Sequence, residues 1–179
     1  MAALDDTMAL DVERFFQYVQ SIEYGYQDRL GKLHFANDAD FSEWEYSFSP
    51  PEEIVANNCG WCWDVAELIK SYCARHALTC RSYFMEYLAT NLHQTHTQVF
   101  LHYQGKWSAA PDNCLGLQLG TPSFDALESC LKWFVSLFTD YLKSVLKEAY
   151  DETNLLVKVY TCTFSAGISE EDYLSTIRQ

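Results

Sequence analysis

Three strand-like segments follow one another in the middle of the chain, and segments with a helical pattern of apolar residues lie on both sides of them. Residues 80–88, 96–103 and 106–110 are rich in β-branched and aromatic side chains, which favour strands. Because only Gln104-Gly105 separates the second and third segments, they are predicted to form an antiparallel hairpin. Helices followed by a small antiparallel sheet are typical of the α+β class.

The flanking segments predict the remaining elements. Apolar spacing and capping residues predict helices over residues 11–23, 50–56, 62–76 and 124–150, and a short helix after Ser169. Residues 24–35 indicate a hairpin or extended loop, residues 113–122 a loop, and residues 155–164 another strand. No repeat, linker or low-complexity segment divides the chain, so we expect a single domain spanning residues 1–179.

The chain is strongly acidic, with 12 Lys and Arg residues, 25 Asp and Glu residues and a formal net charge of −13. Nucleic acids and anionic membrane surfaces bind clustered basic residues, so the charge argues against both kinds of partner. The N-terminus lacks a basic segment followed by an apolar run, and no stretch of about 20 apolar residues occurs. We therefore expect a cytoplasmic protein.

The cysteines number seven, at positions 59, 62, 73, 80, 114, 130 and 162. An odd number in a chain of this length suits reduced thiols, most of them small core residues. Only Cys59 and Cys62 have a suggestive spacing. Cys62 falls in the first turn of the predicted helix 62–76, where unpaired backbone N–H groups and the helix dipole stabilise a thiolate.

A histidine and a carboxylate are placed to act with Cys62. His96 opens the predicted strand 96–103, and an imidazole beside the thiol can take its proton and later protonate a leaving group. Asp112 follows the strand that pairs with the His96 strand, so it is predicted to orient the imidazole, with Asn113 as the alternative. Cys62, His96 and Asp112 thus indicate acyl transfer through a Cys62 thioester.

Several runs of the sequence resemble a bacterial family of transglutaminase-like proteins. These runs are Gly60-Trp61-Cys62-Trp63-Asp64, Tyr83-Phe84-Met85-Glu86-Tyr87, Thr95-His96-Thr97 and Gly105-Lys106-Trp107, and the similarity extends upstream through residues 18–32 and 49–53. The resemblance implies a papain-like core in which Cys62 is the nucleophile, His96 is the base and an acid on the next strand orients the imidazole.

The segment that should carry this acid differs from the family pattern. Relatives have a Glu-containing aromatic segment after the Gly-Lys turn, whereas residues 108–113 of this chain read Ser-Ala-Ala-Pro-Asp-Asn. The run around Cys62 is also similar to arylamine N-acetyltransferases, which are longer and use a Cys-His-Asp triad.

Three candidate residues are predicted to contact the substrate. Trp61 and Trp63 flank Cys62 and either line an acyl pocket or pack in the core. His93 is expected in a loop close to the site. The expected substrate is a protein or peptide, or a small amide or amine; hydrolysis, deamidation and transamidation share the same first half-reaction. No metal or other cofactor is expected.

Other interpretations of these residues stay open. Cys59-Gly60-Trp61-Cys62 is a Cys-x-x-Cys motif at a helix start, as in thiol–disulfide oxidoreductases, although no strand-forming run precedes it. Cys59, Cys62, His93 and His96 offer ligands for zinc, at a spacing longer than that of zinc fingers. A non-catalytic binding module with the same fold is the third alternative.

Overall fold

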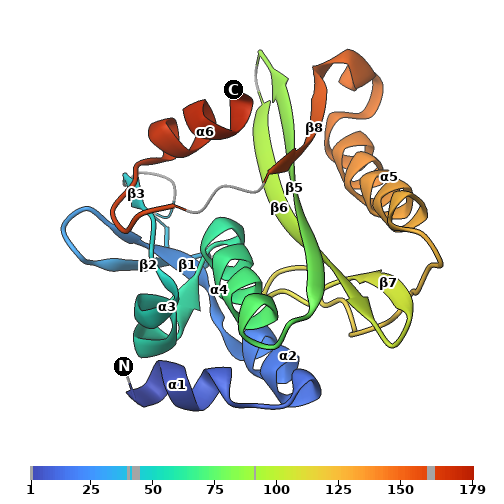
Figure 1. Ribbon diagram of the computed structural model, residues 1–179. Helices are drawn as coiled ribbons and strands as arrows, with labels where there is room; N and C mark the ends of the chain where they lie inside the picture. The colour runs from blue at the N-terminus through green and yellow to red at the C-terminus, as the bar shows by residue number, and fades with distance from the viewer. Residues whose placement is uncertain (1, 40, 42–44, 91, 161–163) are drawn as a thin grey trace.

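The computed structural model describes residues 1–179 apart from residues 1, 40, 42–44, 91 and 161–163 (Figure 1). The described helices are α1 (Ala2–Met8), α2 (Val12–Ser21), α3 (Pro51–Asn57), α4 (Cys62–Arg75), α5 (Leu127–Leu146) and α6 (Glu170–Arg178). The described strands are β1 (Glu23–Asp28), β2 (Leu33–Phe35), β3 (Tyr46–Ser47), β4 (Cys59–Gly60), β5 (Thr79–Ala89), β6 (Leu92–Tyr103), β7 (Lys106–Ala109) and β8 (Leu155–Tyr160). This mixture of helices and sheets agrees with the α+β class.

The longer sheet contains the three strands predicted between residues 80 and 110. Its strand order is β7-β6-β5-β8, and all neighbouring strands are antiparallel. Gln104 and Gly105 join β6 to β7 with φ angles of 52° and 79°, the backbone conformation of a two-residue type I′ turn. In the β5–β6 register, His96 lies opposite Met85. The prediction is confirmed, but β6 begins at Leu92, four residues earlier than expected.

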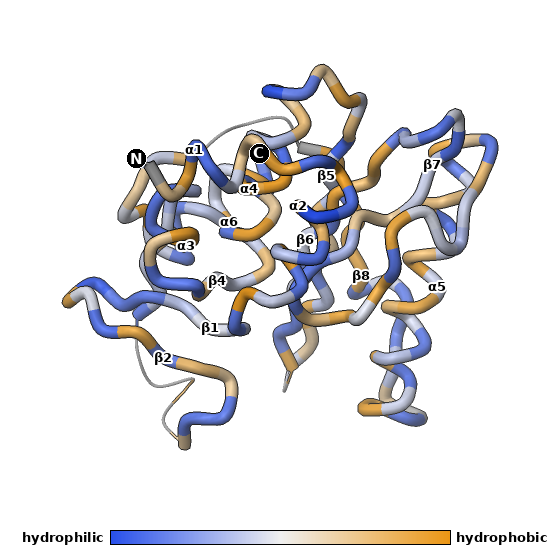
Figure 2. The backbone as a smooth tube through the Cα atoms, turned by 90° about the horizontal axis from the view of Figure 1, so that it is seen from below, coloured by the Kyte–Doolittle hydropathy of each residue, from blue (hydrophilic) through white to orange (hydrophobic). Residues whose placement is uncertain are grey.

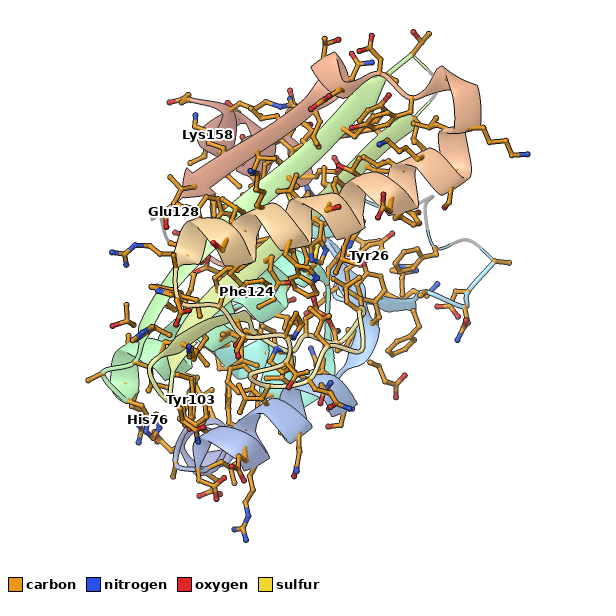
Figure 3. All side chains as sticks on the ribbon, turned by 90° about the vertical axis from the view of Figure 1, so that its right-hand side faces the viewer. Tyr26, His76, Tyr103, Phe124, Glu128 and Lys158 are labelled. Carbon is orange, nitrogen blue, oxygen red and sulfur yellow. The ribbon has the colours of Figure 1, made fainter. Side chains whose placement is uncertain are left out.

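Helices cover both faces of this sheet (Figures 1 and 3). On one face, the α4 residues predicted to be buried pack in the same core as Val99 and Leu101 of β6; they are Val65, Leu68, Ile69 and Tyr72. On the other face, Phe134 of α5 packs with Phe100 and Met85. Neighbouring residues of a strand point to opposite faces, so β6 presents its odd-numbered residues to α4 and its even-numbered residues to α5.

The helix α5 is amphipathic, as its sequence predicts. Apolar and polar positions alternate along it (Figure 2), with Cys130, Phe134 and Leu142 buried. It begins at Leu127 rather than at Phe124, because the backbone of Phe124 exchanges two hydrogen bonds of 2.8 Å with Trp107. None of the described helices combines the length and apolar character needed to cross a membrane.

A smaller sheet is built around β1, and it fixes where α4 begins. β2 and β3 pair with β1 in antiparallel fashion, which confirms the hairpin predicted over residues 24–35. β4 pairs with β1 in parallel, with Tyr24 opposite Gly60. The expectation that no strand precedes Cys62 is therefore wrong, because this two-residue strand ends just before α4.

The N- and C-terminal segments differ in how well they were predicted. The helix α1 was not predicted, whereas α2 and α6 begin at the expected caps: Asp11 accepts from Arg14 N–H at 2.9 Å and Ser169 accepts from Asp172 N–H at 3.1 Å. The strand expected over residues 155–164 is confirmed as β8; residues 161–163, including Cys162, lie outside the described residues.

Candidate active site

Cys62 is the first residue of α4, as the sequence predicts. Asp64 forms this helix start: its carboxylate accepts hydrogen bonds from the backbone N–H groups of Trp61 at 2.8 Å and Ser49 at 3.0 Å, and from the Tyr46 hydroxyl. Asp64 is fully buried. It therefore holds the turn that presents Cys62 and serves the helix N-terminus, as expected, rather than the chemistry.

The Cys62 thiol lies against the edge of β6. On the β7 side of β6, Ala110 N–H donates to the Val99 carbonyl at 2.8 Å. Two residues nearer the start of β6, the Thr97 N–H donates a hydrogen bond to the Cys62 sulfur. The Trp63 N–H, from the first turn of α4, donates to the same sulfur. These bonds favour the thiolate, but burial has the larger effect and raises the pKa of Cys62, with the charges of Asp112 and Asp64 acting in the same direction.

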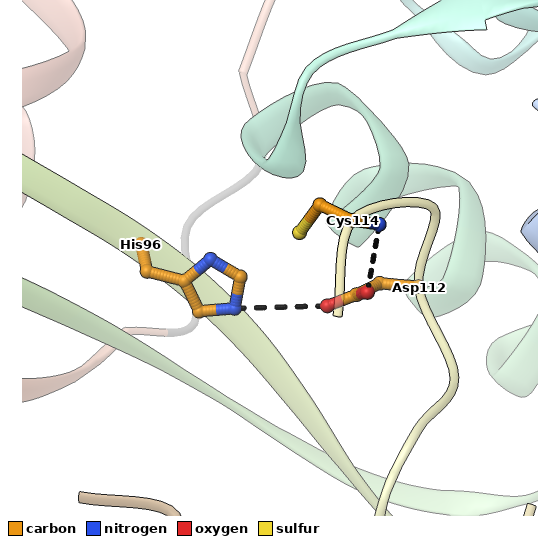
Figure 4. Close-up of side chains that lie close together, drawn as sticks. All are labelled: His96, Asp112 and Cys114. Carbon is orange, nitrogen blue, oxygen red and sulfur yellow. Dashed lines mark hydrogen bonds and ion pairs between the residues drawn. The ribbon is translucent and has the colours of Figure 1, made fainter. Parts of the chain in front are cut away.

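His96 and Asp112 come together at the same edge (Figure 4). The Nε2 atom of His96 lies 3.7 Å from Oδ2 of Asp112, and both side chains are buried. Oδ1 of Asp112 accepts from the backbone N–H groups of Cys114 at 3.0 Å and Leu115 at 2.8 Å, whereas Oδ2 has no hydrogen-bond partner. The loop after β7 therefore holds the carboxylate and points one free oxygen toward the imidazole.

Gln98, which the sequence did not single out, determines how the imidazole of His96 is protonated. The Gln98 amide nitrogen donates to the carbonyls of Val99 and Ala110, both at 2.8 Å, so its Oε1 faces Nε2 of His96 at 3.4 Å. With an acceptor on each side, Nε2 carries the proton and Nδ1 is left as the basic nitrogen. Gln98 lies two residues after His96, on the same face of β6. Strand alternation could therefore have identified it from the sequence.

The side chains around His96 favour the neutral imidazole. Its ring stacks on Phe134 of α5, with centroids 5.6 Å apart. Burial lowers the pKa of His96, while the charge of Asp112 and the hydrogen bond with Gln98 oppose this shift. Asp112 also raises the pKa of Cys62, so its charge acts on both the predicted nucleophile and the predicted base.

Asn113, the alternative to Asp112, has a different role. Its side-chain amide donates to the Gly60 carbonyl at 2.8 Å, and this bond ties the loop after β7 to the strand that leads into Cys62. Asn113 therefore positions the chain before the thiol and does not orient the imidazole.

In the part of the chain that the structure describes, the predicted substrate-binding residues have separate surroundings. Trp63 is fully buried and stacks between Trp61 and Tyr173, with ring centroids at 5.6 and 4.1 Å, so the packing interpretation holds for it. Trp61 also stacks on Tyr26. His93 lies in β6 rather than in a loop, and its Nε2 is 2.7 Å from Oε1 of Glu86. His93 and His96 are three positions apart along the strand, and an odd offset places their side chains on opposite faces of the sheet.

An apolar cleft of about 420 Å³ opens on the His96 side of the sheet. Its lining comes from β1, β6, α5 and the loop after β7. The polar lining residues include Gln94, Thr95, His96 and Cys114, and the apolar and aromatic ones include Tyr24, Leu115, Leu117, Phe134, Phe138 and Tyr141. Cys114 and Tyr24 were not singled out from the sequence. Their nearness depends on how a loop and a strand from distant parts of the chain pack, which residue spacing does not encode.

The structure also bears on the redox and zinc alternatives. Cys59 is buried, and burial raises the pKa of its thiol to about 12, so it lacks the exposed, activated sulfur of a thiol–disulfide oxidoreductase. Among the described residues, no metal-ligand cluster contains Cys59, Cys62 or His93. The four-residue zinc site is therefore not assembled.

In comparisons with known proteins, no protein-family model matches this chain, and no curated protein matches it. The resemblance to transglutaminase-like proteins stays a prediction from the sequence runs around Cys62 and His96.

Proposed function

We propose that this chain is a thiol-dependent acyl-transfer enzyme with a papain-like core, in which Cys62 attacks an amide or ester carbonyl and forms a thioester. One observation carries the proposal. At one edge of β6, the start of α4 brings Cys62 to the Thr97 N–H, β6 brings His96, and the loop after β7 brings Asp112 to 3.7 Å from the imidazole. Three separate elements thus supply a thiol, a base and an orienting acid.

The electrostatics favour a neutral thiol and a neutral imidazole before reaction, because burial raises the pKa of Cys62 and lowers that of His96. His96 then acts as a general base: Nδ1 accepts the thiol proton while sulfur forms a bond to the carbonyl carbon. Asp112 stabilises the resulting imidazolium. The imidazolium returns the proton to the leaving amine or alcohol, and water or an amine then attacks the thioester.

The site is closed around its sulfur, because Cys62 is only 2% exposed. A substrate reaches it only after a local opening, and the apolar cleft beside His96 is the available approach. The lining of this cleft favours an uncharged acyl group.

The pH dependence of Cys62 alkylation tests the proposal. If His96 is the base, the rate should rise as His96 loses its proton, with a midpoint at or below about 6.5. In His96→Ala the midpoint should move to that of an ordinary thiol, about 8.5, or above it. The rate is measured with iodoacetamide between pH 5 and 10, and modification of Cys62 is followed by mass spectrometry of its peptide.

Two variants serve as matched controls. His102 lies on β6 and on the same face as His96 but beyond the site, so His102→Ala should keep the wild-type profile. Cys59→Ala should keep it as well, whereas an oxidoreductase would need both cysteines. A wild-type midpoint of about 8.5 or higher that His96→Ala leaves unchanged would overturn the proposal and favour a non-catalytic binding module.

A further inference from the structure

His96, Asp112 and Cys114 present three different metal-ligating atoms to one small space (Figure 4). A ring nitrogen, a carboxylate oxygen and the Cys114 sulfur all lie within 4.8 Å of one another. The imidazole comes from β6, and the other two groups come from one three-residue stretch of the loop after β7. This is the one such cluster of three or more residues in the part of the chain that the structure describes.

The carboxylate of Asp112 provides a second, independent observation. Asp112 is 5% exposed, and its Oδ2 atom is buried without a hydrogen-bond partner. A buried carboxylate oxygen whose one close polar contact is the 3.7 Å ion pair with His96 is incompletely satisfied, and it points to a ligand that completes its bonding. Oδ1 accepts two backbone N–H groups, from Cys114 and Leu115, and such outer bonds orient metal-ligating carboxylates.

We propose that His96, Asp112 and Cys114 form a binding site for Zn²⁺. Thiolate and imidazole are ligands that select zinc over magnesium or calcium, and one carboxylate completes a common donor set. Zinc–ligand bonds of about 2.0–2.3 Å require the three atoms to approach one another by about 1 Å, within the reach of side-chain rotation. Burial and the neighbouring Asp112 carboxylate raise the pKa of the Cys114 thiol, so it is the bound metal that displaces the thiol proton, which is released as the metal binds.

Three protein ligands leave a fourth coordination position, typically taken by water. His96 and Cys114 both line the apolar cleft, so this position opens into the same space from which a substrate would approach. Zinc bound here occupies the imidazole and the carboxylate that the thiol chemistry uses. The site is therefore inhibitory, a consequence that rests on the proposed acyl-transfer function, whereas zinc binding itself does not.

The binding is tested with Co²⁺, whose absorption spectrum reports its ligands. The wild-type protein, purified in chelator and then freed of it, should bind one Co²⁺ and show a sulfur-to-cobalt charge-transfer band, with Zn²⁺ displacing the cobalt. Cys114→Ser should lose this band and bind Zn²⁺ at least about tenfold more weakly. Cys62→Ser and Cys80→Ser, the latter a partly buried thiol of β5 outside the site, should keep the band.

The inhibition is tested by repeating Cys62 alkylation with and without Zn²⁺. Zinc should slow alkylation of the wild type at least about tenfold, by the same loss of the imidazole that His96→Ala produces, and should not slow Cys114→Ser. A cobalt band that survives in Cys114→Ser, or an absence of metal binding, would overturn the site. Binding through Cys114 that leaves the alkylation rate unchanged would overturn its inhibitory role. The metal-free pH profile judges the acyl-transfer proposal separately.

Discussion

Two of the histidine–carboxylate pairs among the described residues are formed by a buried histidine and a buried aspartate, and they differ in how completely the hydrogen bonds of the aspartate are satisfied. In the hairpin pair, His34 and Asp28, Nε2 lies 2.9 Å from Oδ2 and the side chains are 0% and 4% exposed. In the cleft pair, His96 and Asp112, the corresponding distance is 3.7 Å and the exposures are 9% and 6%. Both pairs are buried, and the cleft pair borders the apolar cleft through His96.

The surroundings of the two carboxylates explain the contrast. Oδ1 of Asp28 accepts from the backbone N–H groups of Leu30 and Lys32, at 2.8 and 2.9 Å, while its Oδ2 bonds to His34. Asp28 thereby closes the β1–β2 turn and its bonds are used within the fold. Asp112 makes the same kind of loop bonds through Oδ1 but leaves Oδ2 without a partner. A carboxylate whose two oxygens are both hydrogen-bonded stabilises structure, and one with an oxygen left over beside a cavity is available for chemistry.

The largest effect expected from this contrast is on reaction rate. His96→Ala should slow acylation of Cys62 by p-nitrophenyl butyrate at pH 7 by about 10²–10⁴-fold, the usual contribution of general acid–base catalysis. His34→Ala should leave the rate near that of the wild type. Release of p-nitrophenol gives the rate, with Cys62→Ala as the background. Equal losses in both histidine variants would remove the functional distinction between the pairs.

The second-largest expected effect is on the free energy of unfolding. Here the loss of the histidine should matter more in the hairpin pair than in the cleft pair. His34→Ala removes a fully buried side chain, and such deletions cost about 2–5 kcal/mol. His96→Ala should cost less, about 1 kcal/mol, because its ring borders a cleft into which the neighbouring side chains can relax. Urea denaturation at pH 7 measures both free energies of unfolding. A larger loss for His96→Ala would mean that the cleft pair is structural.

The parts of this contrast that the sequence predicted are local. Residues 62–76 carry an apolar helical period and a carboxylate at the third helical position, so the position of Cys62 could be predicted from one segment. Asp112 could be placed near His96 because a two-residue turn joins β6 to β7, which limits the possible registers.

The parts that were missed depend on contacts between distant segments. Trp63 is buried because Tyr173 of α6 stacks on it, and nothing near Trp63 in the sequence indicates this partner. β6 begins four residues before its predicted start, so His93 lies in the strand rather than in a loop. Its position in the strand turns its side chain away from the site. Cys114 reaches His96 only through the path of an irregular loop, which residue patterns do not define.

The smallest expected effect is on the pH dependence of stability. The two pairs should lose their contributions to stability in different pH ranges. Burial lowers the pKa of His96 below its ordinary value of 6.5, so the unfolded chain takes up this proton more readily than the folded one. The hydrogen bond from His34, with those from Lys32 and Leu30, lowers the pKa of Asp28 below 3.8, which has the same sign. Each contribution is therefore present above the ordinary pKa and is lost as the pH falls below it.

The cleft pair should thus lose its contribution as the pH falls below about 6.5, and the hairpin pair only below about 3.8. His96→Gln should flatten the wild-type loss of stability between pH 7 and 5, and Asp28→Asn should flatten the loss between pH 4 and 3. One proton limits the difference for His96 to about 1.4 kcal/mol per pH unit. Urea denaturation at each pH gives the free energies. If the wild type instead lost stability as the pH rose above about 6.5, and His96→Gln removed that loss, the pKa of His96 would be set by its carboxylate rather than by burial, and the neutral imidazole required for general-base catalysis at pH 7 would be lost.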